Sequence, residues 1–413
     1  MRGGPILYVL DGYPLPHAQS LNRELDALAR NALSIRAVTT VLLPDHLWSR
    51  EARACAVAVD AMPRLRHPAN DAQLLRFAAR RPRRAWRAAG AFARSIGKLD
   101  ANFLQLRRAF WLADYSRRVG ASVLHAGSAH MSAILAQTAG LLAGLPYTIS
   151  AHADDVFSKE PGLSARLGGA TVVFACNPAA AAAARQSGAR SVVEFRHPLP
   201  ERWLGRPDVT ARPRTGRPLR LVFAARLVSI KGFDTLISAF ARAVGRGADL
   251  ELDVAGAGPE GVLVDGLPPA TRARVRRHGW LDGASYERVL ESADVLVFPG
   301  RTTANGASDG IPNAVLEAFA FGVPVVATLA GSIADTLGAA ADAAGCVERG
   351  TVVQGRTEGE RIAALADLLA RFDPAAPEIV AAAARAQRWV RATFDPASCV
   401  RPLIERFGAL SAR

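Results

Sequence analysis

The sequence predicts an α/β protein with two doubly wound, Rossmann-like domains, and three observations lead to this fold class. Short apolar segments alternate with helical patterns in both halves of the chain, which is typical of parallel sheets covered on both faces. At 413 residues, 50% of them hydrophobic, the chain is long enough to bury two sizeable cores. A stretch without periodicity, rich in Pro, Gly and Arg, separates the halves at 197–218.

The predicted strands are short apolar segments bounded by turn residues. They lie at 6–10, 34–43, 122–126, 147–152 and 171–177 in the first half, and at 220–226, 249–256, 293–300 and 323–329 in the second. We therefore expect a first domain at 1–200, a linker at 201–218 and a second domain at 219–387.

The chain is strongly basic. It has 51 Lys and Arg residues against 37 Asp and Glu residues, so its formal net charge is +14. Such an excess suits nucleic acid, an anionic membrane surface or a phosphate-bearing substrate as a partner. It suits equally well the solvated faces of Ala/Arg-rich helices, and charge alone does not choose among these.

The cysteines do not form a recognisable framework. They lie far apart, without any Cys-x-x-Cys pair, at Cys55, Cys176, Cys346 and Cys399. Neither a zinc site nor a disulfide set is indicated, and we expect small core residues of a reduced, cytosolic protein. No segment reaches the roughly 20 apolar residues of a membrane helix, so a soluble or at most peripheral protein is expected.

The segment 76–118 combines many arginines with aromatic residues. A basic amphipathic helix with aromatic side chains on its other face can lie on an anionic bilayer surface. The same pattern also describes a core-facing apolar stripe with a solvated basic back, which fits any single helix better. The sequence leaves both interpretations open.

A Gly-x-Gly-x-x-Gly run follows a predicted strand, with glycines at Gly256, Gly258 and Gly261. A dinucleotide-binding turn needs a helix that begins at the loop and an acidic residue about 20 positions later. Here prolines delay any helix, and Arg276 and Arg277 stand where the acid belongs. We expect instead that the loop brings its backbone close to a nucleotide, since glycines permit that approach.

Two cations stand at the end of the first strand of the second domain. Arg226 closes that strand, and Lys231 follows five residues later, just before an amphipathic helix. Charge-assisted hydrogen bonds from both side chains, together with the helix dipole, would stabilise a diphosphate leaving group. Taken alone, such a pair is more often a solvated surface pair.

Two carboxylates frame the start of another predicted helix. Asp309 lies in a loop and Glu317 about a turn and a half inside the helix, with Gly310 and Pro312 at the transition. Both carboxylates could reach one crevice, where they would accept hydrogen bonds from paired sugar hydroxyls. The alternative is that Asp309 caps the helix and Glu317 is an exposed helical residue.

A histidine closes one strand of the first domain. His152 ends the predicted strand at 147–152, and Asp154 and Asp155 follow it. An imidazole there would face the cleft between the domains, which makes His152 a candidate catalytic residue. A lone histidine after a strand is commonly structural, satisfied by backbone groups.

Together these motifs resemble the retaining GT-B glycosyltransferases of glycosyltransferase family 4, most closely the branch that builds bacterial exopolysaccharide, lipopolysaccharide and colanic acid. The resemblance runs over nearly the whole chain, through GYPLPHAQSLNRELDAL, YTISAHADDVF, AARLVSIKGFDTLISAF, VAGAGPEG and SDGIPNAVLEAFAFGVPVVAT. It implies two Rossmann-like domains that face a central cleft, the first binding the acceptor and the second the nucleotide sugar. It also implies that 388–413 forms a C-terminal helix that packs back on the first domain.

The resemblance assigns roles to individual residues. It implies that Arg226 and Lys231 bind the nucleotide diphosphate, that Glu317 holds the ribose, and that His152 lies near the sugar and the β-phosphate. Asp309 stands where the family usually has a glutamate that contacts the donor sugar, and it is one methylene shorter. The remaining donor-binding positions are Gly256, Gly258, Gly310, Ile311 and Pro312.

The implied activity is transfer of a sugar from a UDP- or GDP-sugar to a glycan or polyprenyl-linked acceptor, with retention of configuration. No cofactor and no metal are expected, since no Asp-x-Asp motif ends a strand. We expect a cytoplasmic protein, with peripheral contact to an anionic inner membrane face through 76–118 as an open option. No nucleic-acid partner is expected, because that segment contains no recognised binding module.

Two other enzyme classes stay open at this point. The glycine run alone suggests an NAD(P)-dependent oxidoreductase, which would bind dinucleotides. A sugar-phosphate epimerase or phosphorylase would share the GT-B fold, but it would not transfer a sugar to a lipid-linked glycan.

Overall fold

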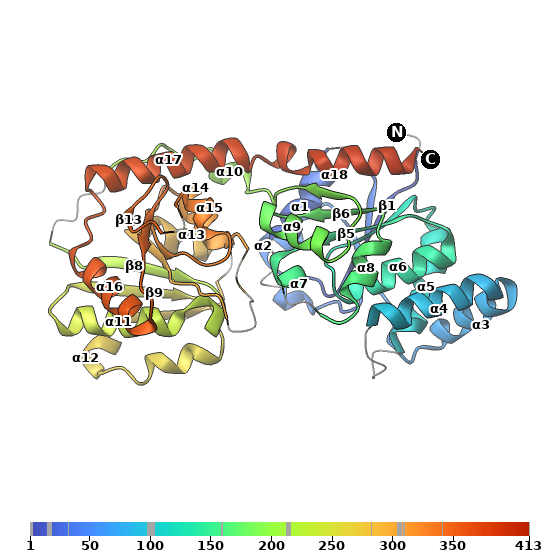
Figure 1. The fold of residues 1–413 in the computed structure, drawn as a ribbon, viewed down its shortest axis with the longest axis horizontal. Helices are drawn as coiled ribbons and strands as arrows, with labels where there is room; N and C mark the ends of the chain where they lie inside the picture. Colours follow the sequence, from blue (N-terminus) through green and yellow to red (C-terminus); the bar gives the residue numbers. More distant parts are fainter. Residues whose placement is uncertain are drawn as a thin grey trace. The chain divides into compact units, whose positions relative to one another are not determined.

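The structure is a computed structural model that describes residues 3–14, 19–31, 33–96, 104–157, 160–211, 216–281, 283–303, 308, 310–340 and 342–412. The chain divides into two compact units, one of Met1–Pro198 with Pro396–Arg413 and one of Leu199–Asp395. Each unit has a seven-stranded sheet with helices on both faces and a hydrophobic core of its own (Figure 1).

The first unit is built on a parallel sheet with the strand order β3-β2-β1-β4-β5-β6-β7. Its strands are β1 Ile6–Leu10, β2 Ile35–Thr39, β3 Val59–Ala61, β4 Val123–Ala126, β5 Tyr147–Ala151, β6 Val172–Ala175 and β7 Val192–Glu194. The central strands β1, β4, β5 and β6 are buried along their whole length and mostly apolar because helices cover both of their faces. The five strands predicted in this half are confirmed, whereas β3 and β7 are edge strands too short to give a pattern.

The helices of this unit cover both faces of its sheet. They are α1 Gln19–Arg30, α2 Arg50–Ala54, α3 Pro68–Arg80, α4 Pro82–Ile96, α5 Gln105–Arg118, α6 Met131–Ala143, α7 Ala153–Phe157, α8 Leu163–Gly169, α9 Pro178–Gln186 and α18 Pro396–Ser411, with the 3-10 turn η1 Asp45–Leu47. Helix α6 is buried almost all round because it packs on β1, β4 and β5 and also against α4 and α5.

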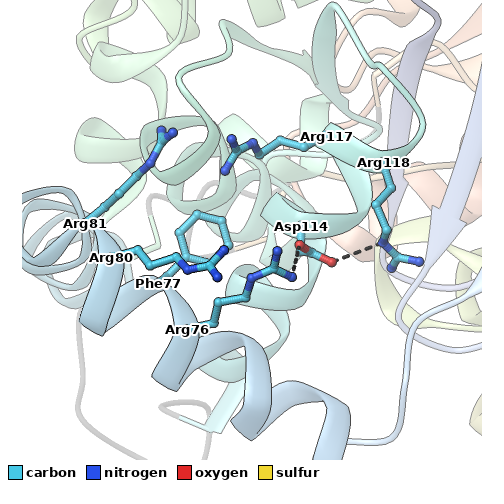
Figure 2. A pocket seen from close by; sticks show the side chains of 7 residues that line it. All are labelled: Arg76, Phe77, Arg80, Arg81, Asp114, Arg117 and Arg118. Atoms are coloured by element: carbon cyan, nitrogen blue, oxygen red, sulfur yellow. Dashed lines mark hydrogen bonds and ion pairs between the residues drawn. The ribbon is translucent and has the colours of Figure 1, made fainter.

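The basic segment 76–118 forms parts of three helices, α3, α4 and α5, rather than one. Most of its aromatic side chains face the core, each 9% exposed or less: Phe77, Phe92, Phe110 and Trp111. Trp86, by contrast, is 82% exposed. The aromatic face is therefore mainly a core face, and several arginines surround a pocket at α3 and α5 (Figure 2).

The second unit has the strand order β10-β9-β8-β11-β12-β14-β13, in which β13 runs antiparallel to β14. Its strands are β8 Leu219–Ala224, β9 Leu250–Ala255, β10 Val275–Gly279, β11 Val295–Phe298, β12 Val325–Thr328, β13 Gly345–Cys346 and β14 Thr351–Val353. Its helices are α10 Glu201–Leu204, α11 Phe233–Gly245, α12 Pro269–Arg272, α13 Gly283–Ser292, α14 Asn313–Ala320, α15 Ile333–Leu337, α16 Glu358–Arg371 and α17 Pro377–Thr393, with the 3-10 helices η3 Ser229–Lys231 and η4 Pro259–Val264. The four strands predicted in this half are confirmed.

Capping side chains explain where some helices begin. The side chain of Asn177 accepts the N–H of Ala180 at 2.8 Å, and Pro178 opens α9. Thr357 and Glu360 form a reciprocal capping box at the start of α16. In both helices, side chains satisfy N–H groups that have no partner inside the helix.

The unit boundaries differ from those expected from the sequence. The expected linker at 201–218 begins with α10, whose Trp203 is 1% exposed and meets Phe321 edge-on, with 5.5 Å between ring centroids. A buried tryptophan thus ties the start of that segment to the second unit. The expected C-terminal helix at 388–413 is interrupted, because α17 ends in the second unit and α18 packs on α1 of the first.

The cysteines also differ from the expectation of four core residues. All four are thiols outside any disulfide, but only Cys399 is buried, while Cys55 and Cys176 are half-buried. Cys346 is exposed because it lies on the short edge strand β13.

Helix α18 places Phe407 in the core of the first unit, with ring centroids 5.2 Å from His125 and 5.5 Å from Phe174. We predict that Phe407→Ala lowers the free energy of unfolding by about 3–5 kcal/mol, because it leaves a cavity. Urea unfolding followed by circular dichroism measures this loss. Leu141→Ala, at a side chain that is 38% exposed, is the control and should cost about 1 kcal/mol or less. Equal losses in the two variants would contradict the prediction.

Candidate functional site

The sheet of the second unit reverses its strand order at β8, which pairs with β9 on one side and β11 on the other. The helices that follow β8 and β11 therefore leave toward opposite faces, and the two loops meet at the carboxyl edge of the sheet. Arg301, just after β11, donates its backbone N–H to the carbonyl oxygen of Ile230 in the β8 loop at 3.0 Å. Doubly wound sheets bind ligands at such a reversal.

The β8 loop carries both of the predicted cations. Arg226 follows β8 and is exposed, and Lys231 ends η3 just before α11 begins. The Nζ atom of Lys231 lies 5.9 Å from the ring centroid of Phe298, the last residue of β11. The two cations thus stand at the strand reversal and close to the positive end of a helix dipole, where an anionic group is stabilised.

The glycine loop after β9 lies against the turn that contains Arg226. Leu227 joins it through two backbone hydrogen bonds, of 3.0 and 3.1 Å. A Cβ atom on Gly256 would stand 1.9 Å from the carbonyl oxygen of Ala225, and one on Gly258 would stand 2.4 Å from that of Leu227. Only glycine allows the two backbones to approach so closely, so the glycine loop packs against the turn that contains Arg226 and holds its conformation.

Glu317 lies on α14, the helix that follows the β11 loop. Its side chain is 7% exposed, so it is not the exposed helical residue that the sequence left as an alternative. Pro312 is the N-cap residue of α14, and Gly310 and Ile311 precede it in half-buried positions. Asp309 lies outside the described residues.

An ion-pair network that the sequence did not reveal stands beside Lys231. The guanidinium of Arg301 contacts the carboxylate of Asp234 and donates to Thr235 Oγ1 at 3.1 Å, and both partners lie in the first turn of α11. Thr235 donates in turn to Glu358. Burial would raise the pKa of Glu358, but the hydrogen bond from Thr235 and the nearby arginines hold it below its usual value. The network therefore fixes the start of α11 at the end of the sheet that carries the two cations.

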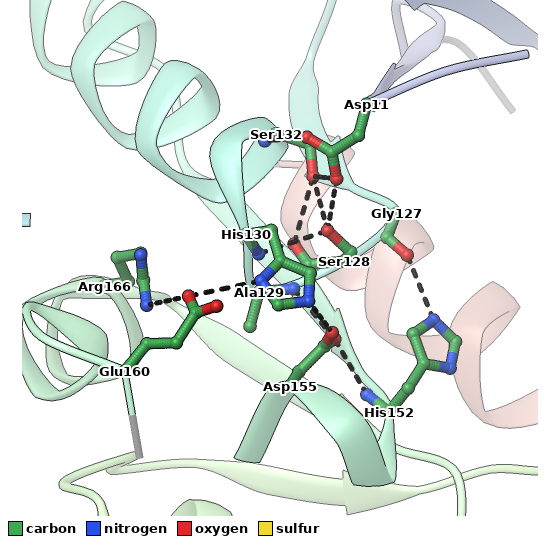
Figure 3. A network of polar contacts seen from close by, with 10 residues as sticks. All are labelled: Asp11, Gly127, Ser128, Ala129, His130, Ser132, His152, Asp155, Glu160 and Arg166. Carbon is green, nitrogen blue, oxygen red and sulfur yellow. Dashed lines mark hydrogen bonds and ion pairs between the residues drawn. The ribbon is translucent and has the colours of Figure 1, made fainter. Parts of the chain in front are cut away.

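The first unit has the same reversal, because β1 lies between β2 and β4. Asp11 follows β1, and its carboxylate accepts the backbone N–H of Ser132 at 2.6 Å and its hydroxyl at 3.0 Å (Figure 3). The hydroxyl of Ser128, just after β4, donates to the same carboxylate. These bonds join the ends of two neighbouring strands to the start of α6.

His130, the residue before α6, stands between two carboxylates (Figure 3). Its Nε2 lies 2.8 Å from Asp155 and its Nδ1 lies 3.2 Å from Glu160, which also pairs with Arg166 at 3.3 Å. The hydrogen bond to Asp155 and the charges of both carboxylates outweigh the effect of burial and raise the pKa of His130 to about 9. His130 is therefore an imidazolium at neutral pH.

His152 follows β5 and belongs to a partly buried chain of polar side chains. Its Nε2 donates to the carbonyl oxygen of Gly127 at 3.1 Å, and its Nδ1 lies 3.2 Å from Nε2 of His197, whose ring stacks on it. Nδ1 of His197 lies 3.2 Å from a carboxylate oxygen of Glu24, but the two atoms are poorly aligned for a hydrogen bond. Glu24 is 1% exposed and accepts the hydroxyl of Tyr8 at 3.0 Å.

The outer partners of the two stacked rings decide where the protons sit. The carbonyl of Gly127 only accepts, so His152 is protonated on Nε2, and the charge of Glu24 favours a proton on Nδ1 of His197. The proton between the two rings is then on Nδ1 of His152. His152 therefore carries a proton on both ring nitrogens and is the imidazolium of the pair. Burial lowers the pKa of His197, whereas for His152 the nearby Cys176 and Asp155 overcome burial and raise the pKa to about 10.

The structure brings some of the sequence-predicted residues together. In the second unit, Arg226, Gly256 and Gly258 share one pair of adjoining loops, and Lys231 ends the first of these loops. His152 belongs to the first unit. In the described part of the chain, no group of three or more His, Cys, Asp or Glu side chains is arranged to hold a metal ion.

Sequence reasoning missed the polar residues that hold these positions in place. They are Asp11, Glu24, Ser128, His130, Ser132, Glu160, His197 and Arg301. A usable signal exists for Asp11, Ser128 and Arg301, since each stands just beyond the carboxyl end of a strand. No such signal exists for Glu24 and His197, because they meet only after the sheet has formed.

Comparison with known proteins places these observations in a family. A family model described as Glycosyl transferases group 1 matches residues 218–371. The putative colanic acid biosynthesis glycosyltransferase WcaL of Escherichia coli (strain K12) is 32% identical over 114 residues, 27% of this chain and 28% of that relative. This chain therefore matches less than a third of the length of WcaL.

A second relative matches over a longer stretch. It is the GDP-mannose-dependent alpha-(1-6)-phosphatidylinositol monomannoside mannosyltransferase of Mycobacterium tuberculosis (strain ATCC 25618 / H37Rv). The two chains are 30% identical over 285 residues, which is 65% of this chain and 71% of the relative.

Solved structures show the same fold. Anabaena Alr3699/HepE, solved in complex with UDP-glucose, covers 98% of this chain and 99% of its own, with a TM-score of 0.66 and 14% identity. At this identity the likeness concerns the fold alone, and it confirms the two-domain α/β fold of the GT-B type that the sequence predicted.

The surroundings of His130 lead to a prediction about pH. Its pKa is about 9 in the folded protein and about 6.5 in an unfolded chain, so its contribution to stability is complete below pH 6.5 and lost as the pH rises through 9. His130→Gln should therefore flatten the fall of the urea midpoint between these two pH values. The exposed His46 on η1 supplies the control variant, His46→Gln. An unchanged slope in His130→Gln would contradict the prediction.

Proposed function

This chain belongs to the group 1 glycosyl transferases, which its motifs identify as glycosyltransferase family 4, and from this premise we propose that it is a retaining glycosyltransferase. It moves a sugar from a UDP- or GDP-sugar to a glycan or polyprenyl-linked acceptor in the synthesis of bacterial cell-surface polysaccharide. One observation carries the proposal: Arg226 and Lys231 share a loop at the strand reversal, directly before α11 and against the glycine loop.

Each site residue has a role in this proposal. Arg226 and Lys231 bind the donor diphosphate, and the backbone of the glycine loop approaches the nucleotide. Glu317, a buried carboxylate on α14, accepts hydrogen bonds from the ribose. Asp309 contacts hydroxyls of the donor sugar from the loop that continues through Gly310, Ile311 and Pro312.

The chemistry requires a nucleoside diphosphate to leave while the sugar becomes oxocarbenium-like. As the bond between the sugar C1 and the phosphate oxygen breaks, negative charge grows on the β-phosphate, and Arg226 and Lys231 stabilise it. The acceptor hydroxyl oxygen bonds to C1 on the face that the diphosphate leaves, which retains configuration. The departing phosphate takes the hydroxyl proton, so no protein nucleophile is required.

His152 adds positive charge near the sugar and the β-phosphate. Its N–H groups are engaged by Gly127 and His197, so we assign it an electrostatic role rather than that of a general acid. This assignment agrees with its raised pKa of about 10, which keeps it charged at neutral pH.

The relatives support a nucleoside-diphosphate sugar as donor. HepE was solved with UDP-glucose, and the mycobacterial relative is GDP-mannose-dependent. The two differ in base and sugar, but both ligands carry the diphosphate that two cations at a helix start would bind.

The oxidoreductase alternative fits the glycine loop poorly. A dinucleotide diphosphate needs an α-helix that starts at that loop, whereas η4 and the four-residue α12 follow it here. Arg276 pairs with Glu251 at 2.8 Å and Arg277 with Asp265 at 3.2 Å, so neither position supplies an acid for the ribose of NAD.

We further propose that the protein works in the cytoplasm, at the anionic inner face of the plasma membrane. The exposed Trp86 among the arginines of α3 and α4 supports this location, because an indole beside cationic side chains suits a lipid headgroup region. No helix in the described part of the chain is long and apolar enough to cross a membrane.

Thermal unfolding with a panel of nucleotides tests the donor. One nucleoside diphosphate, UDP or GDP, should stabilise the protein by about 2.7 kcal/mol at 100 times its dissociation constant. ADP, NAD and NADP complete the panel. If NAD or NADP alone stabilised the protein, the proposed transferase function would be wrong and the oxidoreductase alternative would take its place.

Substitution of the two cations tests the site. Arg226→Ala and Lys231→Ala should each lower kcat by a factor on the order of 10² or more, because each removes charge that stabilises the leaving diphosphate. The stabilisation by nucleoside diphosphate should fall in parallel. Arg242→Ala, at an exposed position of α11, is the matched control and should change neither. Turnover retained in both site variants would refute the assignment.

We also propose that no divalent metal takes part, since the two cations supply the charge that a metal would otherwise provide. Prolonged dialysis against EDTA should leave the rate of sugar transfer unchanged. A rate that EDTA abolishes and Mg²⁺ or Mn²⁺ restores would overturn this part of the mechanism.

A further inference from the structure

An arginine pocket lies at α3 and α5 of the first unit, away from the residues assigned above. Its volume is about 370 Å³, within the range of small-ligand sites. The lining residues are Arg76, Phe77, Arg80, Arg81, Asp114, Arg117 and Arg118. Figure 2 shows guanidinium groups from both helices gathered around the ring of Phe77.

The charge in this pocket is not balanced by its own residues. Among the described residues that line it, Asp114 is the one acid, and it pairs with Arg76 at 3.5 Å and Arg118 at 3.1 Å. Arg80, Arg81 and Arg117 complete the lining. Guanidinium groups held close to one another repel, so a concave group of five favours an anion with more than one charge.

Arginines elsewhere on the surface are arranged differently. Arg246 pairs with Asp367 at 2.5 Å, and Arg274 pairs with Asp249 at 2.7 Å, one cation to one carboxylate. Each of these two arginines has a carboxylate of its own, whereas the five arginines of the pocket share one.

We propose that this pocket binds a terminal phosphate or diphosphate group carried by a membrane lipid. Planar guanidinium groups donate in pairs to phosphate oxygens, and a terminal phosphate carries more charge than a phosphodiester. Phe77, 5% exposed, gives the pocket an apolar wall. The proposal that the pocket binds phosphate depends only on the pocket itself. The proposal that a lipid carries this phosphate rests on the membrane location proposed above.

Exposed apolar side chains on α3 and on the adjoining helix α4 favour a lipid over a soluble ligand. Leu75 on α3 is 67% exposed and Trp86 on α4 is 82% exposed. Large apolar side chains beside cationic ones are typical of surfaces that enter the headgroup region of a bilayer. A nucleic acid would instead need a groove long enough to follow its backbone.

The test compares two variants of the full chain that lose the same charge. Arg80→Gln with Arg117→Gln changes the pocket, and Arg83→Gln with Arg87→Gln changes exposed arginines of α4 outside it. Vesicles of phosphatidylcholine with phosphatidic acid, which has a terminal phosphate, are compared with vesicles containing phosphatidylglycerol, a phosphodiester, at equal mole fraction. Thermal unfolding of each variant with UDP and GDP checks that it is folded and that its donor site is unaffected.

The wild type should prefer phosphatidic acid vesicles, and the pocket variant should lose that preference by at least about tenfold. The α4 variant should keep the preference even if its binding to both vesicles weakens. Equal loss in the two variants, or no preference in the wild type together with no pyrophosphate binding, would overturn the proposal.

A soluble arm separates the phosphate from its lipid. Pyrophosphate is titrated calorimetrically into a protein with Arg226→Ala and Lys231→Ala, so that the donor site does not contribute. If this protein binds pyrophosphate and the pocket substitutions abolish that binding, the pocket is a phosphate site. If the vesicles then show no preference for phosphatidic acid, the phosphate site stands and only the lipid source is overturned. Tighter binding of a single-stranded oligonucleotide, lost in the pocket variant, would overturn the proposal in favour of nucleic acid.

Discussion

A parallel strand cannot turn directly into its parallel neighbour, and this constraint organises both units. Each connection must cross back over the sheet, usually through a helix, and the crossovers share one handedness. Helices can cover both faces of the sheet only if the strand order reverses once, at β1 in the first unit and at β8 in the second. The chemistry-bearing loops stand at these two reversals because the helices that follow neighbouring strands there leave toward opposite faces of the sheet.

The two reversals use their polar residues in different ways. In the first unit, carboxylates and histidines pair with one another, as Asp155 does with His130 and as Glu24 does with His197. Such pairs hold a fixed geometry, and removal of one partner leaves an uncompensated charge in a poorly hydrated place. In the second unit, Arg226 remains exposed at the end of the strand, so its charge is available to a ligand.

The positive charge of the chain has more than one origin. Part of it lies on surface arginines that pair one to one with a carboxylate, such as Arg246 with Asp367, and such pairs contribute little to stability. Another part is concentrated at α3 and α5, where one acid meets five arginines. Sequence composition sums these contributions, whereas the structure separates a compensated surface from a concave basic pocket.

The strands and the motifs that follow them could be predicted because they depend on short-range patterns. The apolar runs of β8, β9 and β11 gave the parallel sheet, and Arg226, Lys231 and the glycines are near strand ends in the sequence itself. Edge strands such as β3 escaped prediction because three residues with one charged side chain show no period. The segment 76–118 was ambiguous for a related reason, since an amphipathic pattern does not show whether its apolar face packs on the protein core or on a membrane.

The sequence by itself determined the fold class, the order of the strands along the chain and the cations at the end of β8, because each follows from local patterns of apolar and charged residues. Tertiary structure alone decided the protonation of His152, the burial of Glu317 and the arginine pocket. His152 and His197 meet, like Arg80 and Arg117, only when strands and helices distant in the sequence pack together. Burial and pairing then set the charge of each group, and neither exists in the extended chain.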